Sequence, residues 1–154
     1  MSRRHAFTLI EILLVVGILA VLASVVFVAL DPAKRFREAR DARRTQDIQS
    51  ILTAIHTYII DNRGFLPAGL DTTERQLGTA TSGCAISTGG CSVSGTGNCL
   101  NLTTPLAKYL KSMPIDPNNG TAALTRYSII IDANNIITVR ACGTEGASPI
   151  SVSQ

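Results

Sequence analysis

The chain has 154 residues, enough for one ordinary domain and an appendage, and its net charge is +3. So small an excess of positive charge excludes the broad basic face that nucleic-acid binding by phosphate neutralisation requires, and no nucleic-acid site is expected. All four cysteines lie in the second half of the chain. Their even number favours disulfides and an oxidising compartment for that half.

The first predicted element is an apolar helix over residues 7–30, in which Glu11 is the single charged residue. At 1.5 Å per residue such a helix is about 36 Å long, enough to cross a hydrocarbon core of about 30 Å. A cleaved signal peptide is the alternative, but its apolar core is usually only about 7 to 15 residues long and contains no acid. We therefore expect a single membrane span with its N-terminus in the cytoplasm, because the cysteines lie on the other side.

A second helix is predicted over residues 31–62, because Asp31 can cap a helix and Pro32 suits a first turn. The helix should therefore restart or bend at Pro32. Charged residues point to all sides between Lys34 and Arg44, which predicts a solvated segment or ion pairs between subunits. An apolar stripe with helical spacing follows, and it predicts a face packed on a core: Ile48, Ile51, Leu52, Ile55, Tyr58 and Ile59.

The remaining chain, residues 63–154, predicts a small globular region. Glycine, serine and threonine dominate residues 78–98, which indicates a long loop that needs a tether. The stretch TPLAKYLKSMP predicts a short helix closed by Pro114, and TRYSIIIDANNIITVRAC predicts an antiparallel hairpin around DANN. The fold class is therefore α+β, with a long helix packed on a small antiparallel sheet.

The cysteine spacing lacks the CxxC pairs of structural zinc sites, so disulfides are favoured over metal. Among the three possible pairings we favour Cys99 with Cys142, which would tie the end of the loop to the sheet, and Cys84 with Cys91.

Candidate sites for metals and catalysis are weak. The DPNNG segment, with Asp116 and Asn118, suggests calcium only faintly, because a turn explains the same residues. His56 lies at the edge of the apolar stripe without a nearby histidine. No nucleophile, base and orienting acid can be assembled, so we expect no enzyme and no cofactor.

The residues RRHAFTLIEILLVVGILAVLA combine a basic leader, a small residue, Phe7 and an acid four positions later in an apolar helix. In this the chain resembles type IV pilins and the pseudopilins of type II secretion. The resemblance implies a leader over residues 1–6, cleavage by prepilin peptidase between Ala6 and Phe7, and N-methylation of Phe7. Major pseudopilins also bind calcium near their C-terminus, which keeps Asp116 and Asn118 as candidates.

Glu11 has two interpretations. It could be an incidental acid that reaches the cytoplasmic membrane surface and stays hydrated. In a filament of bundled helices, however, its carboxylate would be buried at a cost on the order of several kcal/mol unless it were paired. The cleaved amine of a neighbouring subunit is a suitable partner, and the pair would set the axial register.

These observations predict a filament subunit that begins as a single-pass precursor in the cytoplasmic membrane and then enters an extracellular pilus. Its expected partners are other copies, prepilin peptidase, membrane lipid and an inner-membrane assembly platform. A periplasmic pseudopilus is the first alternative. The second, from another class, is a membrane-anchored binding domain that never polymerises.

Overall fold

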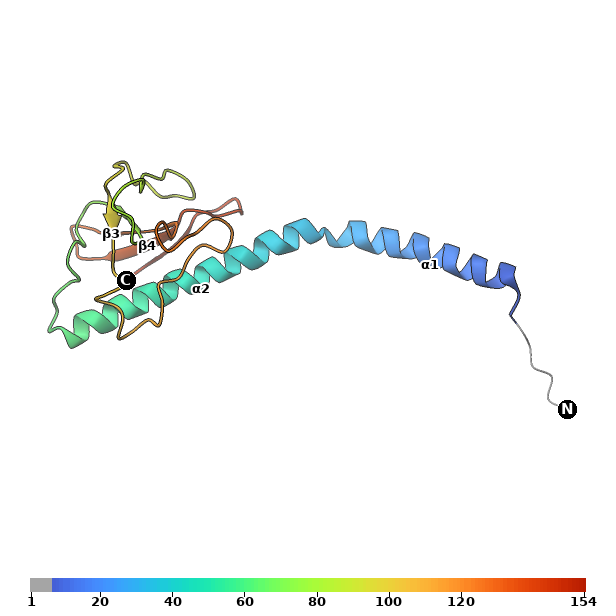
Figure 1. The fold of residues 1–154 in the computed structure, drawn as a ribbon, viewed down its shortest axis with the longest axis horizontal. Coiled ribbons are helices and arrows are strands. Elements are labelled where there is room, and N and C mark those ends of the chain that lie inside the picture. Colours follow the sequence, from blue (N-terminus) through green and yellow to red (C-terminus); the bar gives the residue numbers. More distant parts are fainter. Residues whose placement is uncertain (1–6) are drawn as a thin grey trace. The chain divides into compact units, whose positions relative to one another are not determined.

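The computed structural model describes residues 7–154 (Figure 1). The chain divides into two compact units, of which the first ends at Phe36 and the second begins at Arg37. The first unit contains helix α1 (Leu9–Leu30) and the first turn of helix α2 (Pro32–Asp61). The second unit contains the rest of α2 and a five-stranded sheet. The expected leader, with Ala6, lies outside the described residues.

Both helices begin at capping residues. Thr8 has an extended backbone, and its hydroxyl oxygen accepts a hydrogen bond from the amide of Glu11 at 3.3 Å, so α1 begins two residues later than expected. Asp31 ends α1 with a left-handed backbone, φ 37°, and its carboxylate accepts from the amide of Lys34 at 3.2 Å. The predicted restart at Pro32 is therefore confirmed, since Asp31 closes one helix and caps the next.

The core of the second unit lies between α2 and one face of the sheet (Figure 1). Ile48, Ile51 and Ile55 of α2 are at most 1 % exposed. Tyr58 and Ile59 pack against the same core while partly exposed. The predicted apolar stripe is thus confirmed as the buried face of the helix.

The sheet has the strand order β2-β1-β3-β4-β5. Its strands are β1 (Arg75–Leu77), β2 (Cys99–Leu100), β3 (Tyr127–Ile131), β4 (Ile137–Ala141) and β5 (Ile150–Ser153). All neighbours are antiparallel except β1 and β2, which are parallel. The hairpin of β3 and β4 confirms the prediction, and the Asp132 carboxylate stabilises its turn by accepting from the amides of Asn134 and Ile136.

The expected short helix near Leu106 was wrong. Residues 103–109 form successive turns instead, with the amide of Leu106 donating to the carbonyl of Leu102 and that of Leu110 donating to Leu106. Leu102 and Leu106 are buried in the core. The apolar pattern therefore marked burial correctly, although the segment is too short to form a regular helix.

Two disulfides are confirmed, but the pairing that we favoured was wrong: the bonds join Cys84 to Cys99 and Cys91 to Cys142. The loop folds back on itself, since Ile86 bridges Val93 in antiparallel fashion. This fold-back carries Cys84 toward the end of the loop and leaves Cys91 near its turn. Cys142 does tether the loop to the sheet, through Cys91.

Candidate functional site

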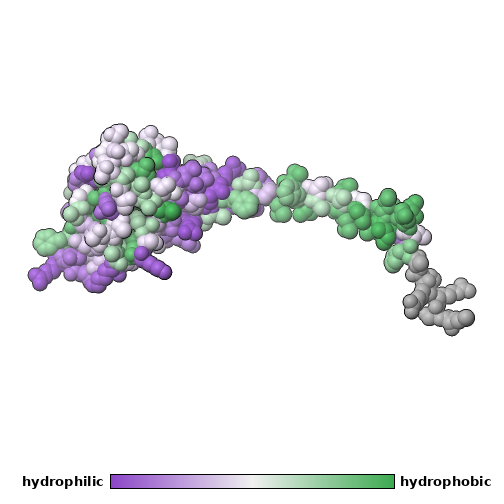
Figure 2. All heavy atoms as spheres, viewed as in Figure 1, coloured by the Kyte–Doolittle hydropathy of each residue, from purple (hydrophilic) through white to green (hydrophobic). Residues whose placement is uncertain are grey.

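Helix α1 is apolar along the face that Figure 2 shows. The exposed residues Ile12, Leu13, Leu14 and Val15 are consecutive, so they place apolar side chains on all sides of the helix. None of its residues is buried, and Leu9 is 83 % exposed. A helix that is hydrophobic all round belongs in lipid or in a protein core. Within residues 7–154, the helical stretch that starts at Leu9 is the one long and apolar enough to cross a membrane. Its surface therefore requires lipid or other protein chains to cover it.

Glu11 lies in the first turn of this helix, three residues after Thr8. The segment Thr8-Leu9-Ile10-Glu11 has the T-x-x-E spacing of a capping box, and the structure contains the hydrogen bond from the Glu11 amide to the Thr8 hydroxyl. A carboxylate in the first turn also interacts favourably with the helix dipole. Sequence reasoning missed Thr8, although the T-x-x-E spacing was a signal that could have found it.

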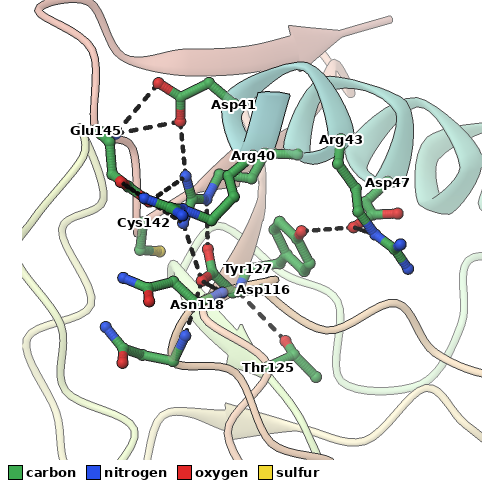
Figure 3. A network of polar contacts seen from close by, with 12 residues as sticks. Arg40, Asp41, Arg43, Asp47, Asp116, Asn118, Thr125, Tyr127, Cys142 and Glu145 are labelled. Carbon is green, nitrogen blue, oxygen red and sulfur yellow. Dashed lines mark hydrogen bonds and ion pairs between the residues drawn. The ribbon is translucent and has the colours of Figure 1, made fainter. Parts of the chain in front are cut away.

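A buried arginine fastens α2 to the loops around the sheet (Figure 3). The side chain of Arg44 is fully buried, and its Nε donates to Asp116 at 2.6 Å while Nη2 donates to the other carboxylate oxygen at 3.1 Å. Nη1 donates to Asp41 at 2.7 Å, and both Nη atoms lie 3.1 Å from Glu145. We call Arg40, Asp41, Arg44, Asp116 and Glu145 the arginine clasp.

The outer part of the clasp joins α2 to the segment after β4. Arg40 forms a two-pronged ion pair with Glu145, in which Nε donates at 2.7 Å. The Asp41 carboxylate accepts from the amides of Glu145 and Gly146, at 3.1 Å and 2.8 Å. Gly143 lies against Asp116, where an added Cβ would stand 2.5 Å from a carboxylate oxygen. The segment of residues 143–146 is therefore held to α2 and Asp116 both by ion pairs of its side chains and by close contacts of its backbone.

The electrostatics of the clasp favour the charged forms. Burial alone would lower the pKa of Arg44, but hydrogen bonds to Asp116, Asp41 and Glu145 outweigh it and raise that pKa. Burial opposes ionisation of Asp116, yet Arg44 and two backbone amides hold its pKa below the usual range. The hydrogen bond from Arg40 lowers the pKa of Glu145 to about 2.

The clasp corrects our expectation for the charged segment 34–44. We expected solvation or ion pairs between subunits, but Arg40, Asp41 and Arg44 pair with residues of their own chain. Arg43, with a side chain 68 % exposed, does face solvent. Sequence reasoning failed because the acidic partner Asp116 is 72 positions away and nothing in the pattern marks it.

The same contacts bear on the calcium candidates. Both carboxylate oxygens of Asp116 accept from Arg44, and one also accepts from the amides of Asn118 and Asn119. The DPNNG segment is therefore a turn that supplies a partner for an arginine. Residues 7–154 contain no group of three or more acidic, histidine or cysteine residues that could hold a metal ion.

The opposite face of the sheet carries a second buried polar cluster. The Glu74 carboxylate accepts from the Ser128 hydroxyl at 2.6 Å and the Ser92 amide at 3.0 Å, and it pairs with Arg140 at 2.9 Å. The loop of residues 78–98 carries Cys84 and Cys91, and we call it the disulfide-bearing loop. It covers this face, because the Ser128 hydroxyl also lies 3.1 Å from the sulfur of Cys91. The buried carboxylates of Asp116 and Glu74 are therefore both held by partners within residues 7–154.

Comparison with protein families identifies the N-terminal segment. Residues 1–27 match the family model described as "Prokaryotic N-terminal methylation motif". The chain carries a prepilin-type processing motif. Such a motif is typical of type IV pilins and pseudopilins, and it implies processing by prepilin peptidase and assembly into filaments. Comparisons with curated proteins and with solved structures gave no match.

The prepilin-type motif and the fold agree with each other. The motif ends inside α1, and the helical stretch from residue 9 to residue 61 leads into a sheet, which is a pilin-like α+β arrangement. The apolar helix fits a membrane-anchored precursor and a later place in a surface pilus. The motif and the fold together indicate a structural protein that acts by associating with other protein chains.

Proposed function

We propose that this chain is a structural subunit of a type IV pilus-like filament and that α1 is its assembly surface. One observation carries the proposal: the processing motif runs directly into a helix that is apolar on all sides and has no buried residue. Membrane lipid covers this helix in the precursor, and the helices of other copies cover it in the filament. The assembly platform of the inner membrane moves the subunit between the two states.

We propose the same division of the chain into segments as the sequence predicts. Residues 1–6 are the leader, residues 7–30 form the membrane and filament-core helix, residues 31–62 continue the helix, and residues 63–154 form the C-terminal globular region. We call the second compact unit, residues 37–154, the head. Prepilin peptidase cuts between Ala6 and Phe7, and the new amine of Phe7 is methylated. The chain takes part in no catalysis of its own.

Glu11 is proposed to recognise the amine of Phe7 on a neighbouring subunit. The only charge within α1 is this carboxylate, and burying it among apolar helices without a partner would cost several kcal/mol, on the order of that for other unpaired charges. Pairing removes most of that cost at one axial offset between subunits. The hydrogen bond to Thr8 comes from the backbone amide of Glu11, so a change of the Glu11 side chain leaves this cap in place and tests the pairing alone.

The arginine clasp supports this function indirectly. Arg44 and Asp116 join α2 to the loops at a fully buried site, so the helix and the sheet behave as one body within the second unit. A filament subunit that is moved by its helix must carry its head along. A firm attachment between α2 and the sheet meets that requirement.

The test is a set of three variants expressed in cells that form the filament. Glu11→Leu removes the charge and the polar side chain, Glu11→Gln keeps a polar side chain of the same shape without the charge, and Ser24→Ala is a control on the same helix. Ser24 donates only to the carbonyl of Val21 in its own turn. We expect processed, membrane-bound protein without filaments for both Glu11 variants and normal filaments for Ser24→Ala, by electron microscopy and by N-terminal sequencing.

The outcomes separate the alternatives. Normal assembly of Glu11→Gln would leave Glu11 as an incidental acid and contradict the pairing proposal. A mature chain that begins at any residue other than methylated Phe7 would contradict the filament proposal and favour a membrane-anchored binding domain. Of the two filament types we propose the extracellular pilus; the two disulfides agree with either type, because the cell exterior and the periplasm are both oxidising.

A further inference from the structure

A cleft of about 450 Å³ lies between the disulfide-bearing loop and the start of β3. Its polar lining consists of the hydroxyl residues Ser87, Thr88 and Ser94 and one charged residue, Arg126. Ile86 and Val93 contribute apolar walls. No acidic residue lines the cleft, so its electrostatic character is set by the arginine.

Arg126 is the unusual member of this group. Its backbone is left-handed, with φ 64°, a conformation that non-glycine residues adopt rarely. Its Nε atom is buried and has no hydrogen-bond partner, and the side chain forms no ion pair within residues 7–154. Buried donors are nearly always satisfied, and strained residues gather at binding sites. Arg126 therefore combines an unpaired charge, an unsatisfied donor and a strained backbone at one place.

Both walls of the cleft, Arg126 on one side and Thr88 on the other, are hydrogen-bonded to the backbone of Cys142. The carbonyl of Arg126 accepts from the amide of Cys142 at 2.9 Å, and the Thr88 hydroxyl donates to the carbonyl of Cys142 at 2.6 Å. The disulfide of Cys91 with Cys142 fixes the loop covalently at this point. Gly89 passes so close to the end of β4 that an added Cβ would stand 2.7 Å from the carbonyl oxygen of Ala141. The cleft is thus built by specific contacts.

We propose that this cleft binds a sugar acid, with Arg126 holding its carboxylate. Arginine presents a planar fork of donors that matches a carboxylate with two hydrogen bonds, and the charge of Arg126 has no competing partner among the described residues. The hydroxyls of Ser87 and Ser94 are also without a partner within residues 7–154, and they can exchange hydrogen bonds with ligand hydroxyls. Ile86 and Val93 suit the apolar face of a sugar ring.

The size of the cleft agrees with this ligand class. Small-molecule sites commonly measure about 300 to 1,000 Å³, so about 450 Å³ suits one or two sugar units and not a long polymer in full. The assignment is independent of filament assembly, because every residue of the cleft belongs to the second compact unit. If the cleft binds no sugar acid, the proposed role of α1 in filament assembly is unaffected.

The test uses the full chain in micelles of a non-ionic polyoxyethylene detergent, which carries neither an anion nor a sugar. Glucuronate, glucose and acetate are titrated while the Nε–H signal of Arg126 is followed by ¹⁵N NMR and the heat of binding by calorimetry. We expect saturable binding of glucuronate with a Kd near 1 mM, about tenfold or more weaker binding of acetate, and no binding of glucose. The Arg126 Nε–H signal should shift only with glucuronate and acetate.

Two variants and two controls test the residues. Arg126→Gln should weaken glucuronate binding about tenfold or more, since it removes the charged fork. Arg63→Gln is its matched control, because Arg63 is exposed and also has a left-handed backbone, φ 58°. If Arg126→Gln fails to fold, Ser94→Asp provides a second test, because its carboxylate would occupy Arg126, with Ser82→Asp outside the cleft as control.

The outcomes are decisive in both directions. Loss of binding in Arg126→Gln or Ser94→Asp, with both controls unchanged, supports the assignment. Equal affinity for glucose or for acetate would overturn it, as would an unshifted Arg126 signal at saturating glucuronate. An equal loss of binding in Arg63→Gln would show that net charge alone attracts the ligand, and this would also overturn it.

Discussion

The arginine clasp makes a quantitative prediction for Asp116→Ala. This change removes two of the five hydrogen bonds that the guanidinium of Arg44 donates, including the shortest one at 2.6 Å. It leaves a fully buried charge with only Asp41 and Glu145 as partners, both of which are partly exposed. Breaking a buried pair by removing one partner typically costs about 3 to 5 kcal/mol.

The amides of Asn118 and Asn119 lose their acceptor as well. We therefore expect the free energy of unfolding to fall by the whole of that cost and not by less. For a unit of this size, each kcal/mol lowers the melting temperature by roughly 3 to 4 °C, so we expect a decrease of about 10 to 20 °C. The assay is thermal unfolding of the full chain in micelles, followed by near-UV circular dichroism with the disulfides intact. That signal reports the tyrosines, including Tyr127 in the core.

Lys108→Ala is the matched control, because Lys108 also forms an ion pair at 2.6 Å, with Asp61, but its side chain is 75 % exposed. Exposed pairs contribute little to stability, so the melting temperature should hardly change. Asp116→Asn keeps an acceptor for the backbone amides and should fall between the two. If Asp116→Ala lowers the melting temperature no more than Lys108→Ala, the clasp does not hold the head together and the reasoning fails.

Four further predictions concern the clasp, the disulfides, the core and the cap of α1. The pKa of Glu145 is lowered from 4.5 to about 2, so its contribution to stability is present above about pH 4.5 and is lost as the pH falls toward 2; the urea midpoint should decrease over that window, and a flat profile would contradict the ion pairs. Removing the disulfide of Cys91 and Cys142, by changing both to alanine, should destabilise the head by about 4 kcal/mol, more than removing the other disulfide, because the closed loop is longer; calorimetry of both variants tests this. Ile55→Ala, at a fully buried position, should cost about 2 to 5 kcal/mol by urea unfolding, and a cost below about 1 would contradict its place in the core. Thr8→Ala should cost about 0.5 to 2 kcal/mol at the start of α1, seen as faster amide exchange in the first turn, whereas unchanged exchange would show that the cap is unimportant.

Local signals in the sequence were sufficient for the helices and the central hairpin. The apolar run to Leu30, the Asp31-Pro32 pair and the spacing of Ile48, Ile51 and Ile55 each depend on neighbours within a turn or two of the chain. The hairpin of β3 and β4 likewise needs only two β-rich runs and a turn. Such features follow from backbone geometry and side-chain periodicity, so they can be predicted without knowledge of the fold. The processing motif belongs to the same class, because it is a short contiguous pattern.

Tertiary structure alone decided the contacts between distant segments. The short strands β1 and β5 form because β3 and β4 offer edges to pair with, and β2 pairs in turn with β1. Strands of two to four residues carry too little pattern to predict from the sequence. The disulfide pairing depended on the fold-back of the loop, and the burial of Arg44 depended on a carboxylate 72 positions away. A charged residue on a helix normally stays in water, since desolvation opposes burial; only a preformed set of partners, Asp116 first among them, makes the buried position stable.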